Sequence, residues 1–171
     1  MSLFETAVSR VLEDEGGYSD SPNDPGGTTN YGISIRFAGS IDLDIDGDGQ
    51  TTNADIIALT PERAREVYKQ YFWNENKCGE MPAGVGYALF DGAVNQGSIA
   101  VKYLQRASGA YADGLVGLQT LGAVRSADKA KLLDDYCTMR ALHYAGLSTF
   151  KMFGRGWFKR LFRVHRLACG D

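Results

Sequence analysis

The stretch that decides the fold runs from residue 14 to residue 33. It reads Asp14-Glu15-Gly16-Gly17-Tyr18-Ser19-Asp20-Ser21-Pro22-Asn23-Asp24-Pro25-Gly26-Gly27-Thr28-Thr29-Asn30-Tyr31-Gly32-Ile33. The segment before it opens with a capping-box pair, Ser2 and Glu5, and then repeats apolar residues with the period of a helix. Two glycines follow Glu15, and Pro, Gly, Asn and Thr dominate the residues after them. The sequence therefore predicts a helix over residues 2–14 that presents Glu15 at its end and leads into a polar loop.

Two carboxyl groups in this stretch have contrasting surroundings. Glu15 follows Val11 by four residues, so it lies on the apolar stripe of the helix. Apolar surroundings disfavour the ionised form, and we expect Glu15 to remain protonated and able to donate a proton. Asp24 lies in the polar loop and is expected to remain ionised. Such a pair is typical of glycosidic bond cleavage, although a surface glutamate followed by a turn-capping aspartate would give the same residues.

The residues around Glu15 resemble those of the phage-type endolysins of glycoside hydrolase family 108, which are N-acetylmuramidases. The family pattern is a helix ending in Glu-Gly-Gly-Tyr, then Pro-x-Asp-x-Gly-Gly-x-Thr, then a Tyr-Gly-Ile segment. Here the three parts read Glu15-Gly16-Gly17-Tyr18, Pro22-Asn23-Asp24-Pro25-Gly26-Gly27-Thr28-Thr29 and Asn30-Tyr31-Gly32-Ile33-Ser34. The resemblance implies a mainly α, lysozyme-like helical fold with a C-terminal helical lobe like those that bind peptidoglycan.

The resemblance also implies an activity. It is hydrolysis of the β-1,4 bond between N-acetylmuramic acid and N-acetylglucosamine in peptidoglycan, with Glu15 as general acid. Asp24 would position or activate water, and Thr29, or its neighbour Thr28, would help to hold that water. Tyr18 and Tyr31 are the expected substrate contacts in this stretch. If Asp24 instead caps the loop, a single-glutamate mechanism remains, including lytic transglycosylation, and a non-catalytic wall-binding or secretion-assisting protein is a third hypothesis.

Composition narrows the class of protein. A chain of 171 residues suits one domain, or a catalytic lobe with a smaller one, and its net charge of -3 gives no reason to expect nucleic acid as a partner. No apolar run approaches the roughly 18 residues of a membrane span, and the first residues lack the basic region of a signal peptide, so we expect a monomer held in the cytoplasm until release. The resemblance implies a holin-like permeabilising partner.

The three cysteines have no Cys-x-x-Cys spacing, which favours free thiols and argues against a zinc site.

An aspartate-rich segment over residues 42–56 fits a twelve-residue calcium loop. Carboxylate or amide oxygens recur at alternate positions, a glycine occupies the sixth, and an acid occupies the twelfth. The last acid is aspartate in place of the usual glutamate, which predicts a weaker structural site, as in the dockerin loops that this one resembles. A solvated turn is the alternative. The predicted Ca2+ ligands are Asp44, Asp46, Asp48, Gln50 and Asp55.

The segment Phe90-Asp91-Gly92-Ala93-Val94-Asn95-Gln96-Gly97 resembles a further family motif, Phe-Asp-x-Ala-Val-Asn-x-Gly. Asp91 and Asn95 are four residues apart in a predicted helix over 82–95, so they project from one face. Polar groups in this arrangement can line a sugar-binding groove. They can equally face solvent or hold two helices together.

The sequence also predicts a short helix from Ile33 to Gly39 and a helix that opens at Thr60-Pro61. The C-terminal half predicts further helices, over residues 98–105 and from Ser126 to about Tyr144, and a basic, aromatic tail over residues 151–166. Between the first two, residues 112–120 resemble the Asp-Gly-x-x-Gly-x-x-Thr element of peptidoglycan-associated proteins. The tail could contact an anionic wall polymer or a membrane, but core packing with an exposed basic rim is the simpler interpretation. We predict a catalytic lobe over 1–97 and a helical lobe over 98–171, packed together as one compact unit.

Overall fold

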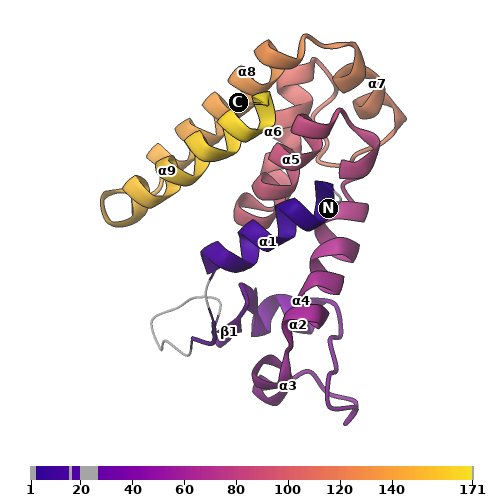
Figure 1. Cartoon of the computed structure of the whole chain (residues 1–171), viewed down its shortest axis with the longest axis vertical. Coiled ribbons are helices and arrows are strands. Elements are labelled where there is room, and N and C mark those ends of the chain that lie inside the picture. The colour runs from indigo at the N-terminus through magenta and orange to yellow at the C-terminus, as the bar shows by residue number, and fades with distance from the viewer. Residues whose placement is uncertain (1–2, 16, 20–26, 171) are drawn as a thin grey trace. The chain divides into compact units, whose positions relative to one another are not determined.

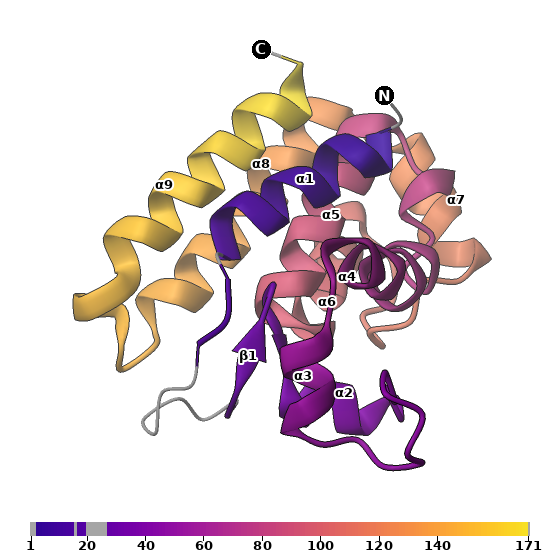
Figure 2. The ribbon, with the colours of Figure 1, turned by 60° about the horizontal axis from the view of Figure 1, so that its bottom comes forward.

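The computed structural model describes residues 3–15, 17–19 and 27–170, and for Asp14 and Glu15 it describes the backbone. This part of the chain is mainly helical, and its only paired strands are two residues long (Figures 1 and 2). The predicted mainly α class is therefore confirmed. In order, the elements are α1 (Leu3–Glu15), β1 (Thr29–Asn30), β2 (Ile33–Ser34), α2 (Ile35–Ser40), α3 (Asn53–Ala58), α4 (Pro61–Val67), the π-helix η1 (Tyr68–Asn74), the 3-10 helix η2 (Cys78–Glu80), α5 (Ala83–Gln96), α6 (Ser98–Ser108), α7 (Leu118–Ser126), α8 (Lys129–Ala145) and α9 (Phe150–Cys169).

The chain forms two compact units with a boundary between residues 69 and 70. One unit comprises Glu5–Lys69, and the other comprises Met1–Phe4 together with Gln70–Asp171. We name them the N-terminal unit and the helical unit. The division differs from the predicted one between residues 97 and 98, because α5 packs against α6, α8 and α9 and so belongs with the C-terminal helices.

The helical unit is built around α5. Residues 84–93 of this helix are all buried, and its glycines allow other elements to approach closely. A Cβ added at Gly84 would lie 1.9 Å from the backbone oxygen of Ala168 in α9, and one at Gly86 would lie 2.1 Å from the backbone oxygen of Cys78. Helix α5 can therefore occupy the interior only because these positions have no side chain. Trp73 is a core residue and packs its ring edge-on against Phe4 and Phe90.

The N-terminal unit combines short helices with a small antiparallel pairing. Strands β1 and β2 pair in the register Thr29 with Ser34 and Asn30 with Ile33. Each short helix that follows has a side-chain cap at its start: Ser34 for α2, Thr52 for α3 and Thr60 for α4. The predicted opening of a helix at Thr60-Pro61 is confirmed, with Pro61 in the first turn.

Two predicted helix starts need correction. The helix expected from Ile33 begins at Ile35, because Ile33 and Ser34 pair with β1. Ser126 does not open the long C-terminal helix but is the last residue of α7. Asp128 caps α8 instead, and its carboxylate accepts a hydrogen bond from the Lys131 N–H at 2.8 Å.

Within the described ranges, no helix combines the length and apolarity needed to cross a membrane. Cys78, Cys137 and Cys169 are free thiols.

Candidate active site

The end of α1 carries the predicted acid. The helix runs to Glu15, as predicted, and Phe4, Ala7, Val8 and Val11 form its buried stripe. Glu15 follows Val11 by one helical repeat, which gives its backbone the position that the sequence indicated. The Glu15 side chain and the whole of Asp24 lie outside the described residues.

Thr29 pairs through its backbone with the segment that follows α1. Its backbone pairs with Ser19, with Ser19 N–H to Thr29 O at 2.8 Å and Thr29 N–H to Ser19 O at 2.9 Å. The Thr29 hydroxyl donates to the Gly27 carbonyl at 3.1 Å. Thr28 is buried, and its carbonyl accepts from the Ile35 N–H. The chain that enters and the chain that leaves residues 20–26 are thus joined side by side, next to Tyr18, whose side chain is 50% exposed.

The turn between β1 and β2 is fixed by two long-range hydrogen bonds. The buried Asn30 amide donates to the Ile56 carbonyl at 2.9 Å, at the end of α3. The Tyr31 carbonyl accepts from the Tyr68 hydroxyl at 2.9 Å. Tyr31 itself has a φ of 50°, a left-handed conformation that L-residues seldom adopt and that these contacts hold in place. The sequence indicated Tyr31 as a substrate contact but gave no sign that Asn30 anchors the turn.

The aspartate-rich loop brings three of the five predicted metal ligands together. Carboxylate oxygens of Asp44, Asp46 and Asp48 lie within 4.8 Å of one another, and all three side chains are exposed. The loop folds around Asp44, whose two oxygens accept from the Gly47 and Gly49 N–H groups at 2.7 and 3.0 Å. Three converging carboxylates can hold a metal ion, and without a cation their mutual repulsion is unfavourable.

Asp55 is not part of this cluster of carboxylates. Asp55 is fully buried, and its oxygens accept from the N–H groups of Thr52 at 2.7 Å and Ile45 at 2.6 Å. It forms a capping box with Thr52 at the start of α3. These backbone hydrogen bonds, that of Thr52 first, outweigh burial and hold the pKa of Asp55 below its ordinary value. Gln50 is exposed, and its backbone N–H donates to Asp48.

Asp91 holds helices together, which is one of the arrangements that the sequence left open. It is buried, and its two oxygens accept from Arg140 Nη2 at 2.7 Å and Arg160 Nε at 2.8 Å. Burial on its own would raise the pKa of Asp91, but the charges of Arg140 and Arg160 prevail and hold it below its ordinary value. Asp91 therefore ties α5 to α8 and α9. The neighbouring Asn95 is partly buried and donates to the Asp91 carbonyl at 2.7 Å.

The Asp-Gly element at residues 113–120 is organised by a buried side chain that the sequence did not single out. The Gln105 amide nitrogen donates to Asp113 Oδ1 at 2.8 Å and to the Thr120 hydroxyl at 3.1 Å, and its oxygen accepts from the Gly114 N–H at 2.8 Å. The element is thus a turn built on Gln105. Only the position of Gln105 after Leu104 and Val101, inside an apolar stripe, could have indicated that it is buried.

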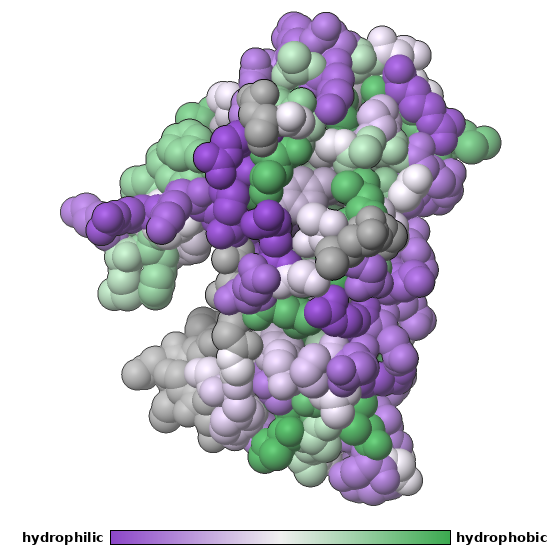
Figure 3. Space-filling view, in the orientation of Figure 1, coloured by the Kyte–Doolittle hydropathy of each residue, from purple (hydrophilic) through white to green (hydrophobic). Residues whose placement is uncertain are grey.

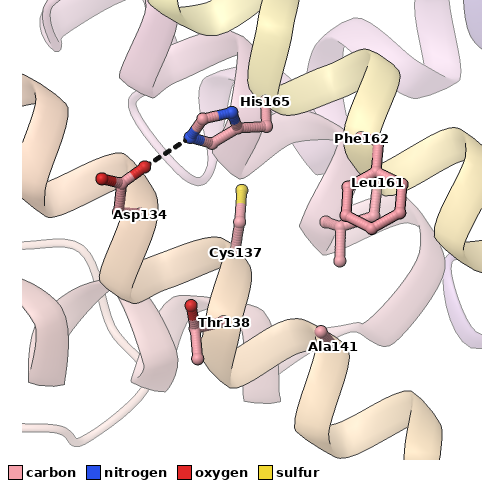
Figure 4. Close-up of a pocket in the computed structure, with 7 residues that line it drawn as sticks. All are labelled: Asp134, Cys137, Thr138, Ala141, Leu161, Phe162 and His165. Atoms are coloured by element: carbon pink, nitrogen blue, oxygen red, sulfur yellow. Dashed lines mark hydrogen bonds and ion pairs between the residues drawn. The ribbon is translucent and has the colours of Figure 1, made fainter.

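The described residues of the helical unit line at least three hollows, two of which are larger than the third. One, of about 360 Å³, is lined by η1, the start of α6 and the turn that contains Leu115. The other, of about 260 Å³, lies between α8 and α9 (Figure 4). There His165 and Asp134 point toward each other, with Nε2 and Oδ1 2.7 Å apart, and the thiol of Cys137 points toward the same ring. Neither hollow includes a residue predicted from the sequence to act on substrate.

Comparison with known families identifies the class of protein. Residues 8–97 match the family described as "Glycosyl hydrolase 108", which covers more than half of the chain. Residues 99–162 match the family described as "Predicted Peptidoglycan domain". The chain belongs to glycosyl hydrolase family 108. The resemblance drawn from the Glu15 stretch is confirmed, and the two matches together support a peptidoglycan hydrolase.

A solved structure gives a whole-chain comparison. The structure described as that of Brucella abortus SagA matches with a TM-score of 0.86 and 38% sequence identity, over 97% of this chain and 93% of that one. No curated protein matches the chain.

Proposed function

We propose that this protein is an N-acetylmuramidase that hydrolyses the β-1,4 bond between N-acetylmuramic acid and N-acetylglucosamine, with Glu15 as general acid. The observation that carries the proposal is the family match over residues 8–97, which includes the end of α1 at Glu15. The peptidoglycan domain over residues 99–162 supports the same polymer as substrate.

The chemistry assigned to Glu15 follows from its place on α1. In the sequence Glu15 follows the buried Val11 by four residues, and an apolar setting favours the protonated form of a carboxyl, which can donate to a leaving oxygen. Asp24 is proposed to activate the attacking water, and Thr29 to help hold it. A pair acting in this way leaves room for a water between the carboxyls, roughly 6.5 to 9.5 Å apart, and inverts the anomeric centre.

The substrate contacts are proposals of the same kind. Tyr18 is exposed and Tyr31 is partly exposed, and tyrosine rings can stack on the apolar face of a sugar. Asn95, in the helical unit, is a separate proposed contact. Its amide nitrogen is used within α5, so its oxygen is the group that would accept from a sugar hydroxyl.

Clearing of purified cell walls tests the role of Glu15. The variant Glu15→Gln keeps the size of the side chain but cannot donate the proton, so the rate of clearing should fall by at least about 100-fold. Glu13→Gln is the matched control, because Glu13 is an exposed glutamate of the same helix and should clear walls at the wild-type rate. Equal clearing by wild type and Glu15→Gln would remove Glu15 from the mechanism. No clearing by wild type on walls of several chemotypes would favour the non-catalytic, wall-binding hypothesis.

Lytic transglycosylation by the same glutamate is the competing activity. It would release an anhydro-muramic end, whereas hydrolysis releases a reducing end. The support for Asp24 as a water-activating group comes from the family motif, and Asp24→Asn should therefore slow hydrolysis while leaving a transglycosylase unaffected.

For the cluster of Asp44, Asp46 and Asp48 we propose Ca2+ as the ion. The three carboxylates and the glycine at the sixth position fit the loop chemistry of this hard cation, and the ion would brace the segment before α3. Calorimetric titration should show a calcium site that Asp44→Asn weakens at least about tenfold, since one of three ligand charges is lost. Asp42→Asn, next to the cluster but outside it, should bind as wild type does. Absence of both binding heat and a calcium-dependent rise in melting temperature would refute the proposal.

A further inference from the structure

The outer face of α9 carries a stripe of exposed cations. Lys151, Arg155, Lys159 and Arg166 are all exposed, and their spacing of four, four and seven residues places them on one side of the helix. Within the described residues none of the four forms an ion pair. We call this set of four residues the basic stripe.

The basic stripe stands out against the charge of the rest of the chain. Residues 1–149 contain 12 Lys and Arg against 20 Asp and Glu, whereas residues 136–170 contain no acidic residue. The attraction of the stripe for an anionic surface is therefore not offset by acids on its own helix.

Large apolar side chains are exposed on the same hairpin of α8 and α9. Met152 is 76% exposed and Phe162 67%, and Leu142, on α8, is 68% exposed. Met152 precedes Arg155 and Lys159 by three and seven residues, so it lies beside them on the helix, and Phe162 lies between Lys159 and Arg166. Figure 3 shows green and purple residues intermixed over the end of this hairpin, at the left of the view. Exposed apolar groups gathered on one element indicate an interaction surface.

The rotation of α9 about its axis is fixed from inside. Gly154, Leu161, Val164 and Ala168 are buried, and Arg160 reaches the buried Asp91 carboxylate. With these groups held in the interior, the basic stripe, Met152 and Phe162 must stay on the opposite side. The face is therefore presented permanently and does not depend on a conformational change.

We propose that this face of α9 binds the surface of an anionic phospholipid bilayer peripherally. Interfacial helices combine basic side chains, which attract anionic headgroups, with apolar side chains that enter the headgroup boundary. A wall polymer also carries anionic groups, but it offers no apolar layer in which Met152 and Phe162 could be buried. The proposal adds a second partner to the peptidoglycan substrate and does not depend on the hydrolytic mechanism.

Sedimentation with lipid vesicles tests the charged part of the face. The full-length protein should bind vesicles of phosphatidylcholine mixed with phosphatidylglycerol, should not bind phosphatidylcholine alone, and should be released by salt. Each cation near the surface contributes about 1 kcal/mol, so Arg155→Gln with Lys159→Gln should weaken binding about thirtyfold. Lys129→Gln with Lys131→Gln changes the net charge equally at the far end of α8 and should have little effect.

A second pair of variants tests the apolar part. Met152→Ser with Phe162→Ser should weaken vesicle binding about tenfold, because apolar side chains leave the interface. Leu118→Ser, at an exposed leucine of α7, is the control and should bind as wild type does. Clearing of purified walls, which contain no bilayer, should be unchanged in all these variants.

Three results would overturn the proposal. In the first, the wild type binds neutral and anionic vesicles equally. In the second, the Lys129 and Lys131 control loses as much vesicle binding as the Arg155 and Lys159 variant. In the third, the wild type does not bind vesicles, and the Arg155 and Lys159 variant loses binding to the cell wall. The last result would assign the stripe to an anionic wall polymer. Failure of wall clearing by the wild type would bear on the hydrolase alone, since vesicle binding is measured without it.

Discussion

Asp91 accepts hydrogen bonds from two arginines that belong to two different helices, and the salt bridges lie in the interior of the helical unit. Arg140 is fully buried, and its remaining donors reach the Gln96 side chain at 2.6 Å and the Ala88 carbonyl at 3.4 Å. A buried guanidinium is tolerated because its donors are used and its charge is balanced. Loss of the Asp91 charge would leave that cation without its counter-ion.

Asp91→Asn should therefore lower the free energy of unfolding by about 3–5 kcal/mol at neutral pH, measured by urea denaturation. The pKa of Asp91 is lower in the folded protein than in the unfolded chain, where it is about 3.9. The contribution of the Asp91 carboxylate to the free energy of unfolding is therefore complete above that pH, and it is lost as the pH falls through the folded pKa. The difference between wild type and variant should shrink in the same acid range. Asp135→Asn makes the same chemical change at the exposed pair with Lys131 and should cost under about 1 kcal/mol. Similar losses for both variants would contradict the account of Asp91.

The sequence could indicate that Arg140 is buried but not what it binds. Arg140 lies four residues from both Tyr136 and Tyr144, in the buried stripe of α8, so its position is a local signal. Its acid partner is 49 residues away, and nothing local selects Asp91 from the other acids. The position of Glu15 at a helix end was easier to predict, because the helix end and the apolar stripe are both encoded within a few residues.

At the scale of elements, α5 sets the packing of the helical unit through its glycines. Glycine is unfavourable in a helix interior by about 1 kcal/mol relative to alanine, so helix propensity alone does not explain glycine at these positions. Gly84 and Gly86 meet backbone oxygens of Ala168 and Cys78, which a Cβ would displace. The close approach of these elements to α5 therefore depends on the absence of side chains.

Gly84→Ala should destabilise the protein by about 1–3 kcal/mol despite the gain in helix propensity, because a methyl group cannot fit beside a backbone carbonyl. Gly122→Ala is the matched control. Gly122 lies within α7, and a Cβ added there would have nothing within 4 Å, so the same substitution should stabilise by up to about 1 kcal/mol. Thermal unfolding of the two variants compares them directly, and a loss of stability in both would show that packing at Gly84 is not the cause.

Elements were predicted well where their signals are local. The end of helix α1 at Glu15 and the Thr60-Pro61 start of α4 both follow from signals of a few residues. The start of α2 and the start of α8 were wrong, because strand pairing and the choice between two nearby caps depend on neighbours. Asp55 fits two local motifs. The calcium-loop motif indicates a metal ligand, and the pairing with Thr52, three residues earlier, forms a capping box at the start of α3.

At the scale of the whole molecule, the family matches divide the chain near residue 97, whereas packing divides it near residue 69. The catalytic family's region therefore extends into the helical unit through α5, which also carries Asp91. The boundary between the two family matches does not coincide with the boundary between the two packed units, because residues from both matched regions form the core of the helical unit. Variants of α5 should for the same reason be judged by stability before their effect on activity is interpreted.

Mass spectrometry of purified peptidoglycan digested in ¹⁸O-labelled water tests most directly whether the protein hydrolyses the glycosidic bond after N-acetylmuramic acid. We expect fragments that end in a reducing N-acetylmuramic acid carrying one labelled oxygen, and we expect these fragments to be lost in Glu15→Gln. Fragments with an unlabelled anhydro-muramic end, or with a labelled reducing end on N-acetylglucosamine, would contradict this expectation.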